Sequence, residues 1–401
     1  MNIILFDDAP IRKNLLPLTF TRPVAELRVG ILTITQKWEK WLNGTVSYIT
    51  EDYLAGKYAI EVADVNVVIN ASVLPSERLV ALVEQLEMNE ALLQGDELIA
   101  AKLNEKQFER LMEDEEIDEL QGFDVEDTPF NRIKHPYDIF LCNGEEIAID
   151  FQLITKGRAS QSLSPSNQIA NPAHIFIEEG ARVECAMLNA NAGPIYIGKN
   201  AEVMEGSLIR GPFALGENSK VKMGSKIYGK TTIGPWSKVG GEINNSVIIG
   251  HSNKGHDGYL GNAVLGEWCN LGAGTNNSNL KNNYAEVKLW NYAAERFLPT
   301  GQQFCGLIMG DHSKVGIGVT FNTGTVVGVS CNIFGAGFPR NFIPSFSWGG
   351  AAGFKTYRND KAMDTAERVM QRRGKPLEVA ERVILIRISE DTAKFRRWEQ
   401  K

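Results

Sequence analysis

Aliphatic residues recur at every sixth position over the central part of the chain. Glycine often stands directly after the aliphatic residue, as in Ile197-Gly198 and Val327-Gly328. The repeat is made of two runs, Ile197, Val203, Ile209, Leu215, Val221, Ile227, Ile233 and Val239, then Met309, Val315, Phe321, Val327 and Ile333. A period of six is typical of a parallel β-helix that places three short strands in each coil. The pattern predicts a left-handed parallel β-helix over residues 156–340, with inward aliphatic side chains stacked from coil to coil.

Two segments interrupt the repeat, and interruptions of solenoids commonly carry function. The first surrounds residues 250–259. The second, residues 275–306, is rich in asparagine and aromatic residues. Its length is sufficient for an arm that reaches a neighbouring subunit.

The regions on either side of the repeat have other patterns. Residues 1–155 combine buried-strand candidates at 3–6 and 65–70 with helical patterns at 76–86 and 105–120, which predicts an α/β, Rossmann-related domain. Residues 341–401 predict a helical C-terminal tail, with helices at 360–372 and 378–398. We expect this tail to fold back over the end of the β-helix and to cover its strand edges.

The composition of the chain limits the classes of binding partner that are expected. The chain has 42 basic and 49 acidic residues and a net charge of −7, which favours neither nucleic acid nor an anionic membrane surface as a partner. Its five cysteines are scattered singly, without the paired spacing of a zinc site. No signal peptide and no run of about 20 apolar residues is visible. A cytoplasmic protein that binds small molecules or other proteins is expected.

Three short motifs follow one another around the first interruption. They are Lys254-Gly255-His256, Tyr259-Leu260-Gly261 and the turn at residues 271–275. Together they resemble the acetyltransferase domain of the bifunctional N-acetylglucosamine-1-phosphate uridyltransferase/glucosamine-1-phosphate acetyltransferase family. The resemblance implies that acetyl-CoA is the co-substrate and that His256 is the general base, a role that suits an imidazole at neutral pH. It also implies a homotrimer.

The same resemblance assigns further residues to the acetyl-transfer site. Tyr259 and Asn279 match positions that line the sugar pocket, while Ala273 and Gly274 match the coenzyme side. Backbone N–H groups of the turn at 272–274 are candidates for stabilising the oxyanion. Arg340 is a candidate ligand for a coenzyme phosphate. The family's phosphate-binding arginine and lysine are absent, and Lys238 is the candidate substitute.

Near the N-terminus, residues 17–30 (PLTFTRPVAELRVG) resemble a conserved stretch of sugar-1-phosphate nucleotidyltransferases. The resemblance is incomplete, because Asp7-Asp8-Ala9-Pro10 replaces the glycine-rich phosphate loop, Val24 replaces a lysine and Ser72 replaces the magnesium-binding aspartate. Four cations remain as candidates for binding a sugar phosphate, UTP or dTTP: Arg12, Lys13, Arg22 and Arg28. Weak candidates for binding Mg²⁺ are Asp7, Asp8 and Asp150.

The sequence thus predicts acetyl transfer from acetyl-CoA to an amino-sugar phosphate in nucleotide-sugar biosynthesis. Two alternatives stay open. One is a sugar-1-phosphate nucleotidyltransferase whose β-helix is only a scaffold. The other is a catalytically silent sugar-nucleotide-binding regulator.

Overall fold

The computed structural model describes residues 1–112 and 120–399, which form two compact units. The first unit contains Met1–Leu15, Arg22–Leu27 and Leu32–His135. The second contains Leu16–Thr21, Arg28–Ile31 and Pro136–Lys401. Two short pieces of the N-terminal region therefore belong to the same unit as the repeat.

The first unit is built on a six-stranded sheet with the order β2-β1-β3-β5-β4-β6. Its strands are β1 (Asn2–Phe6), β2 (Thr45–Ile49), β3 (Val65–Asn70), β4 (Glu90–Gln94), β5 (Glu97–Asn104) and β6 (Gln121–Asp124). Strand β1 is parallel to both β2 and β3, as in Rossmann-related sheets, whereas β5 is antiparallel to β3 and β4. Apolar side chains such as Ile4, Val68 and Phe108 form its core.

Four helices accompany this sheet in the described residues: α1 (Ala9–Asn14), α2 (Ile34–Leu42), α3 (Glu77–Gln85) and α4 (Glu105–Met112). Side-chain caps at Asp8, Thr33 and Ser76 start the first three, because each side chain accepts a backbone N–H of the first turn. The helix expected at 105–120 begins as predicted, but residues 113–119 lie outside the described part of the chain.

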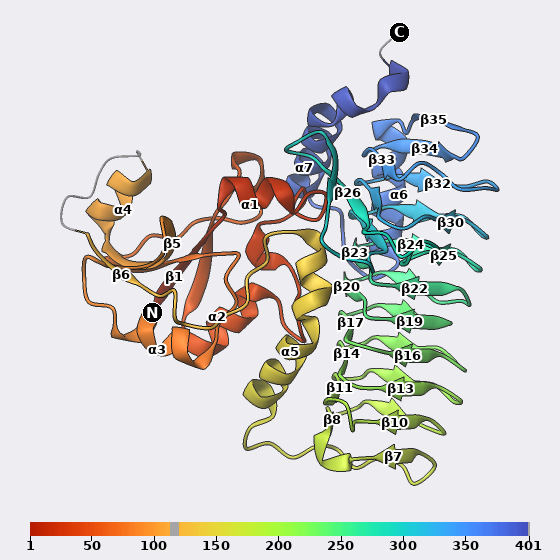
Figure 1. Ribbon diagram of the computed structural model, residues 1–401, viewed down its shortest axis with the longest axis horizontal. Helices are drawn as coiled ribbons and strands as arrows, with labels where there is room; N and C mark the ends of the chain where they lie inside the picture. Colours follow the sequence, from red (N-terminus) through yellow and green to blue (C-terminus); the bar gives the residue numbers. More distant parts are fainter. Residues whose placement is uncertain (113–119, 400–401) are drawn as a thin grey trace. The chain divides into compact units, whose positions relative to one another are not determined.

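The second unit is the predicted left-handed parallel β-helix, and Figure 1 shows its strands stacked in columns. The first column has the order β22-β19-β16-β13-β10-β7 and the second β33-β31-β28-β23-β20-β17-β14-β11-β8. The third has the order β35-β34-β32-β29-β24-β21-β18-β15-β12-β9. We call them the first, second and third sheets. The fold class expected from the sequence, including the α/β region and the helical tail, is confirmed.

The strands are short because each spans one face of a coil. The first sheet contains β7 (Gln168–Ala170), β10 (Met187–Asn189), β13 (Leu208–Arg210), β16 (Lys226–Tyr228), β19 (Glu242–Asn244) and β22 (Tyr259–Gly261). The second contains β8 (Ile175–Ile177), β11 (Ile195–Ile197), β14 (Phe213–Leu215), β17 (Thr231–Ile233), β20 (Val247–Gly250), β23 (Val264–Glu267), β28 (Leu307–Met309), β31 (Thr325–Val327) and β33 (Phe342–Ile343). The third contains β9 (Arg182–Val183), β12 (Glu202–Val203), β15 (Lys220–Val221), β18 (Lys238–Val239), β21 (Asn253–Lys254), β24 (Asn270–Leu271), β29 (Lys314–Val315), β32 (Asn332–Ile333), β34 (Ser347–Gly350) and β35 (Gly353–Thr356).

The predicted inward positions form one continuous apolar core. Ile197, Ile233 and Val327 are fully buried, and the other residues of the two hexad runs are buried with them. Each stacks on its equivalent in the next coil, as the pairings Val203↔Val221 and Val221↔Val239 show. The β-helix continues beyond Arg340 through β33, β34 and β35.

Helix α5 (Pro136–Thr155) was not expected from the sequence. It packs against β14, β17, β20 and β23 of the second sheet. The Asn143 side chain accepts the Gly30 N–H at 2.8 Å and donates to the Lys230 carbonyl at 2.8 Å. This helix and residues 28–31 therefore cover one face of the β-helix.

Both expected interruptions take a different form in the structure. Residues 250–259 continue the coils through β20, β21 and β22, and only the length of the coil changes. Residues 275–306 contain β25 (Asn276–Asn277), which pairs with β30 (Thr320–Phe321), and a hairpin of β26 (Lys288–Asn291) and β27 (Arg296–Pro299). This hairpin packs on its own chain, because Trp290 stacks on Phe342 with ring centroids 4.1 Å apart, and contact of the segment with a neighbouring subunit stays a prediction.

The tail contains two helices, α6 (Asn359–Gln371) and α7 (Val379–Asp391), followed by 3-10 turns at Ala393–Phe395 and Arg397–Glu399. The second predicted helix therefore ends earlier than residue 398. Trp398 donates to Thr356 at 3.0 Å and stacks on Phe354, so the chain end covers β35. The tail also runs back along the β-helix, because Arg373 donates to the Trp236 carbonyl.

Candidate functional site

His256 lies on the turn between β21 and β22, with its side chain exposed. The backbone of this turn is held at three consecutive carbonyls. Lys254 Nζ donates to His256 O at 2.8 Å, the Gly274 N–H donates to Asp257 O at 2.9 Å, and the Glu242 N–H donates to Gly258 O at 3.2 Å. An accessible imidazole on a fixed turn suits a general base.

Gly258 closes this turn in a conformation that requires glycine. Its φ is +125°, and a Cβ atom built there would lie 2.1 Å from the Thr275 carbonyl oxygen. The next coil therefore approaches the His256 turn more closely than any side chain would permit.

Two predicted sugar-pocket residues are brought into contact beside this turn. Asn279 Nδ2 donates to the Tyr259 hydroxyl at 3.0 Å and to Asn262 Oδ1 at 2.8 Å. The Tyr259 N–H donates to Asn276 Oδ1 at 2.8 Å. Burial raises the pKa of Tyr259, so its hydroxyl stays a neutral donor and acceptor at neutral pH. These side chains form a polar wall suited to a ligand with several hydroxyl groups.

The turn at 272–274 does not match its expected role in stabilising an oxyanion. The Gly272 N–H donates to Val315 O at 2.9 Å, and the Gly274 N–H is the donor that holds Asp257 O. Ala273 contributes its carbonyl to the Gly318 N–H at 2.8 Å. The expectation is wrong for Gly272 and Gly274, because the hydrogen bonds between coils use their N–H groups. Gly274 instead supports the His256 turn.

Lys238 lies on β18 of the third sheet, whereas Tyr259 lies on the first sheet, so the structure places them on different faces. Lys238 pairs in register with Lys220. Its pKa is lowered by burial and by nearby cations, of which Arg373 has the largest effect, followed by Lys220, Lys222 and Arg372. We call Lys220, Lys222, Lys238, Arg372 and Arg373 the cationic cluster. It joins strands of the β-helix to the end of α6.

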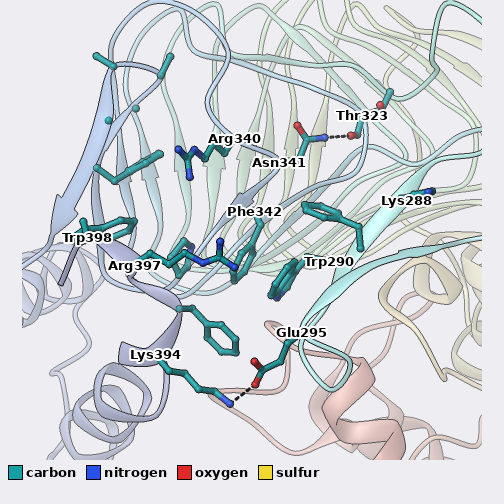
Figure 2. A pocket seen from close by; sticks show the side chains of 18 of the residues that line it. Lys288, Trp290, Glu295, Thr323, Arg340, Asn341, Phe342, Lys394, Arg397 and Trp398 are labelled. Atoms are coloured by element: carbon teal, nitrogen blue, oxygen red, sulfur yellow. Dashed lines mark hydrogen bonds and ion pairs between the residues drawn. The ribbon is translucent and has the colours of Figure 1, made fainter. Parts of the chain in front are cut away.

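Arg340 lines a pocket of about 1120 Å³ near the last coils of the β-helix. Its walls combine aromatic rings, including Trp290 and Phe342, with Arg340 and Arg397. Figure 2 shows the Trp290 and Phe342 rings face to face, with the side chains of the two arginines beside them. On the opposite side, Lys394 forms an ion pair with Glu295 at 2.5 Å. Aromatic faces next to guanidinium groups suit a ligand that carries both a base and phosphates.

In the first unit, three of the predicted phosphate and metal ligands, Arg12, Asp7 and Asp8, have structural partners. The Arg12 guanidinium and Asp7 carboxylate form a buried ion pair at 2.8 Å, and Arg12 also donates to Arg22 O at 3.0 Å. Asp7 accepts the Thr50 hydroxyl at 2.6 Å and the Val24 N–H at 2.8 Å, while burial raises its pKa. Asp8 accepts the Ile11 N–H at 2.9 Å as the cap of α1. Arg22 is buried, and Lys13 is exposed on α1.

Two further candidates belong to the second unit. Arg28 Nε donates to Ile249 O at 3.0 Å, and Asp150 accepts the Ile31 N–H at 2.8 Å. Within residues 1–112 and 120–399, no group of three or more histidine, cysteine, aspartate or glutamate side chains could hold a metal ion. The donor set of Asp7, Asp8 and Asp150 does not fit a shared Mg²⁺ site, because these carboxylates pair with arginine, cap a helix and accept a backbone N–H.

Comparison with known proteins shows sequence similarity to one family and to three bifunctional proteins. Residues 3–159 match the sugar nucleotidyl transferase family. A bifunctional sugar-1-phosphate nucleotidylyltransferase/acetyltransferase of Sulfurisphaera tokodaii is 36% identical over 144 residues, which is 35% of each chain. The bifunctional protein GlmU of Methanocaldococcus jannaschii is 36% identical over 90 residues, which cover 22% of this chain and 21% of that protein. That of Methanococcus aeolicus is 34% identical over 87 residues, which cover 22% and 20%. The resemblance expected from the motifs is confirmed, although the matches span about a third or less of these relatives.

The region that matches the sugar nucleotidyl transferase family lacks the phosphate loop expected from the resemblance. Helix α1 begins at Ala9, directly after the Asp8 cap, so a helix start occupies this place. Ser72 is buried, and its side chain and N–H both donate to Asn70 Oδ1.

Among the described residues of the chain, no helix is long and apolar enough to cross a membrane.

Some residues near the site were missed by the sequence analysis. Arg372 and Arg373 influence the pKa of Lys238 only because the tail reverses direction, and no local sequence pattern indicates this reversal. Lys254 belongs to the Lys254-Gly255-His256 motif, but the sequence analysis assigned no role to it. Its signal is present in the sequence, because it replaces the aliphatic residue that other coils carry at the same place.

Proposed function

We propose that this protein transfers an acetyl group from acetyl-CoA to the amino group of an amino-sugar phosphate, with His256 as general base. The observation that carries the proposal is the exposed imidazole of His256 on a turn fixed by three hydrogen bonds, beside the Tyr259–Asn279 pair. The names of the relatives, which include an acetyltransferase, support the same chemistry. The protein is proposed to act as a homotrimer.

The proposed reaction is a direct displacement at the thioester. The amine nitrogen attacks the thioester carbonyl carbon while the His256 imidazole accepts the proton that the nitrogen loses. The C–N bond forms, the C–S bond breaks, and coenzyme A leaves as its thiol after taking up a proton. Tyr259 and Asn279 would orient the sugar through its hydroxyl groups, because both present polar atoms beside the His256 turn.

The test is release of free thiol from acetyl-CoA by the full chain, with glucosamine-1-phosphate and a panel of other amino sugars as acceptors. We expect release that depends on one of the acceptors, with formation of an N-acetyl product confirmed by mass spectrometry. Absence of release with every acceptor, from protein that is folded by circular dichroism, would reject the proposal.

We also propose that the pocket lined by Arg340 binds the nucleotide end of acetyl-CoA, with the adenine near its aromatic wall and phosphates near Arg340 and Arg397. Replacing Arg340 by alanine is then expected to raise the KM for acetyl-CoA roughly 10-fold, as loss of a charge-assisted contact predicts. Acetyl-pantetheine, which lacks the nucleotide, should be used equally well by both proteins. The control is Arg368→Ala, which removes an exposed arginine that pairs with Asp364 on α6. An equal rise in KM for both donors would contradict the assignment.

The cationic cluster around Lys238 is proposed to bind the phosphate of the acceptor. Because Lys238 and Tyr259 lie on different faces of one chain, the cluster and the sugar pocket would come from neighbouring subunits of the proposed homotrimer. Replacing Lys238 by methionine is expected to raise the KM for the amino-sugar phosphate roughly 5- to 10-fold, because one cation is lost from a site where other cations surround it. The KM for the same sugar without its phosphate should stay within about 2-fold. Steady-state kinetics with both acceptors measure the difference. Equal changes for the two acceptors would show that Lys238 does not contact the phosphate.

A further inference from the structure

From β9 to β32, the inward positions of the third sheet are aliphatic in every coil except one. The aliphatic positions are Val183, Val203, Val221, Val239, Leu271, Val315 and Ile333, and all belong to the buried core. Lys254 pairs with Val239 in register, and its neighbour Asn253 pairs with Asn270, so Lys254 occupies the place between Val239 and Leu271. A lysine therefore stands inside an otherwise apolar stack, in the coil that continues into the His256 turn.

This lysine is buried with only 2% of its surface exposed. Its ammonium group donates to Gly240 O at 2.8 Å and to His256 O at 2.8 Å. Burial lowers its pKa to about 8, against a weaker opposing effect of Asp257. A buried cation costs free energy that an aliphatic side chain at the same place would not. The stability of the β-helix therefore gives no reason for lysine here.

Both partners of Lys254 belong to turns on the side of the β-helix where His256 stands. Gly240 follows β18, and His256 lies one coil further along, so Nζ bridges two neighbouring turns. The bond from Lys254 to His256 O holds the backbone of His256, whose side chain is exposed. The bonds to Asp257 O and Gly258 O come from backbone N–H groups, which leaves Lys254 as the side chain that fixes this turn.

We propose that Lys254 is a positioning residue that holds the backbone of the His256 turn, so that the imidazole stays in the orientation needed for proton transfer. This inference rests on the proposed acetyl transfer. Lys254 donates to backbone carbonyls and not to the imidazole, so it is proposed to act through the His256 carbonyl. Its effect is expected on kcat rather than on substrate binding, because misplacement of a general base slows the chemical step.

The chain contains a matched control in Lys314. This lysine is partly buried, its pKa is also lowered by burial to about 8, and its ammonium group donates to the carbonyls of His312 and Trp268. It bridges two neighbouring turns in the same way as Lys254, but not the turn of His256. Replacing it removes a lysine that makes the same kind of bonds between turns, without affecting the His256 carbonyl.

The test compares Lys254→Met and Lys314→Met in the full chain. For Lys254→Met we expect kcat to fall roughly 10-fold, the KM of each substrate to stay within about 2-fold, and the Tm to be unchanged or higher. For Lys314→Met, kcat should remain within about 2-fold. The glutamine amide of Lys254→Gln can donate to one of the two carbonyls, so this variant should retain more of kcat than Lys254→Met. If Lys254→Met does not fold, Lys254→Gln is compared with wild type in its place.

Hydrogen–deuterium exchange over residues 255–261 gives a readout that does not depend on activity. Faster exchange there in Lys254→Met, but not in Lys314→Met, would support the positioning role. If wild-type protein shows no acetyl transfer, that absence rejects the proposed function, while faster exchange in Lys254→Met still supports the anchoring of the turn. Unchanged exchange, wild-type kcat in Lys254→Met, or an equal loss of kcat in Lys314→Met would overturn the inference.

Discussion

Replacing His256 by alanine is expected to lower kcat for acetyl transfer roughly 100-fold or more, because the amine must then lose its proton without a positioned base. The His256 side chain is exposed, so the substitution removes little packing and the Tm should change little. Thiol release from acetyl-CoA under saturating substrates measures kcat, and thermal unfolding measures stability.

The matched control for this substitution is His174→Ala. His174 is also an exposed histidine of the β-helix, on a 3-10 turn before β8, in an early coil. Its replacement should leave kcat within about 2-fold. Wild-type turnover in His256→Ala, at an unchanged Tm, would remove His256 from the mechanism and with it the main support for acyl transfer.

The largest effect on stability is expected from Phe213→Ala in the interior of the β-helix. Phe213 is fully buried on β14 and belongs to the same core as the hexad residues. Removing its ring should lower the free energy of unfolding by about 3–5 kcal/mol, because the apolar contacts are lost and the stacked coils cannot collapse around the cavity. Urea denaturation followed by circular dichroism measures this change.

Leu208→Ala is the corresponding control in the same region of the chain. Leu208 lies on β13 with its side chain 47% exposed, so its truncation should change the free energy of unfolding by about 0.5 kcal/mol or less. Equal losses in the two variants would contradict the assignment of inward and outward positions that follows from the repeat.

The sequence was sufficient for the β-helix because its determinant is local. Each inward residue, such as Ile233 or Val239, stacks on its equivalent one coil away, so burial follows from a spacing that is readable along the chain. The motif around His256 was readable for the same reason, since all its parts lie within neighbouring coils. Helix α5 was missed because it buries Asn143, Glu146 and Asp150 together with its apolar residues, which obscures the usual helical pattern.

The sequence by itself thus determined the repeat, the inward residues and the position of His256 within a short motif, whereas the exposure of its side chain comes from the structure. Only the tertiary structure decided which polar groups are available for function. Asp7 and Arg12 satisfy each other, the N–H groups of Gly272 and Gly274 are used between coils, and the tail brings Arg373 back to Trp236. The physical reason is that a hydrogen bond or ion pair depends on which segments meet in space, whereas the hexad pattern depends only on which residues face inward.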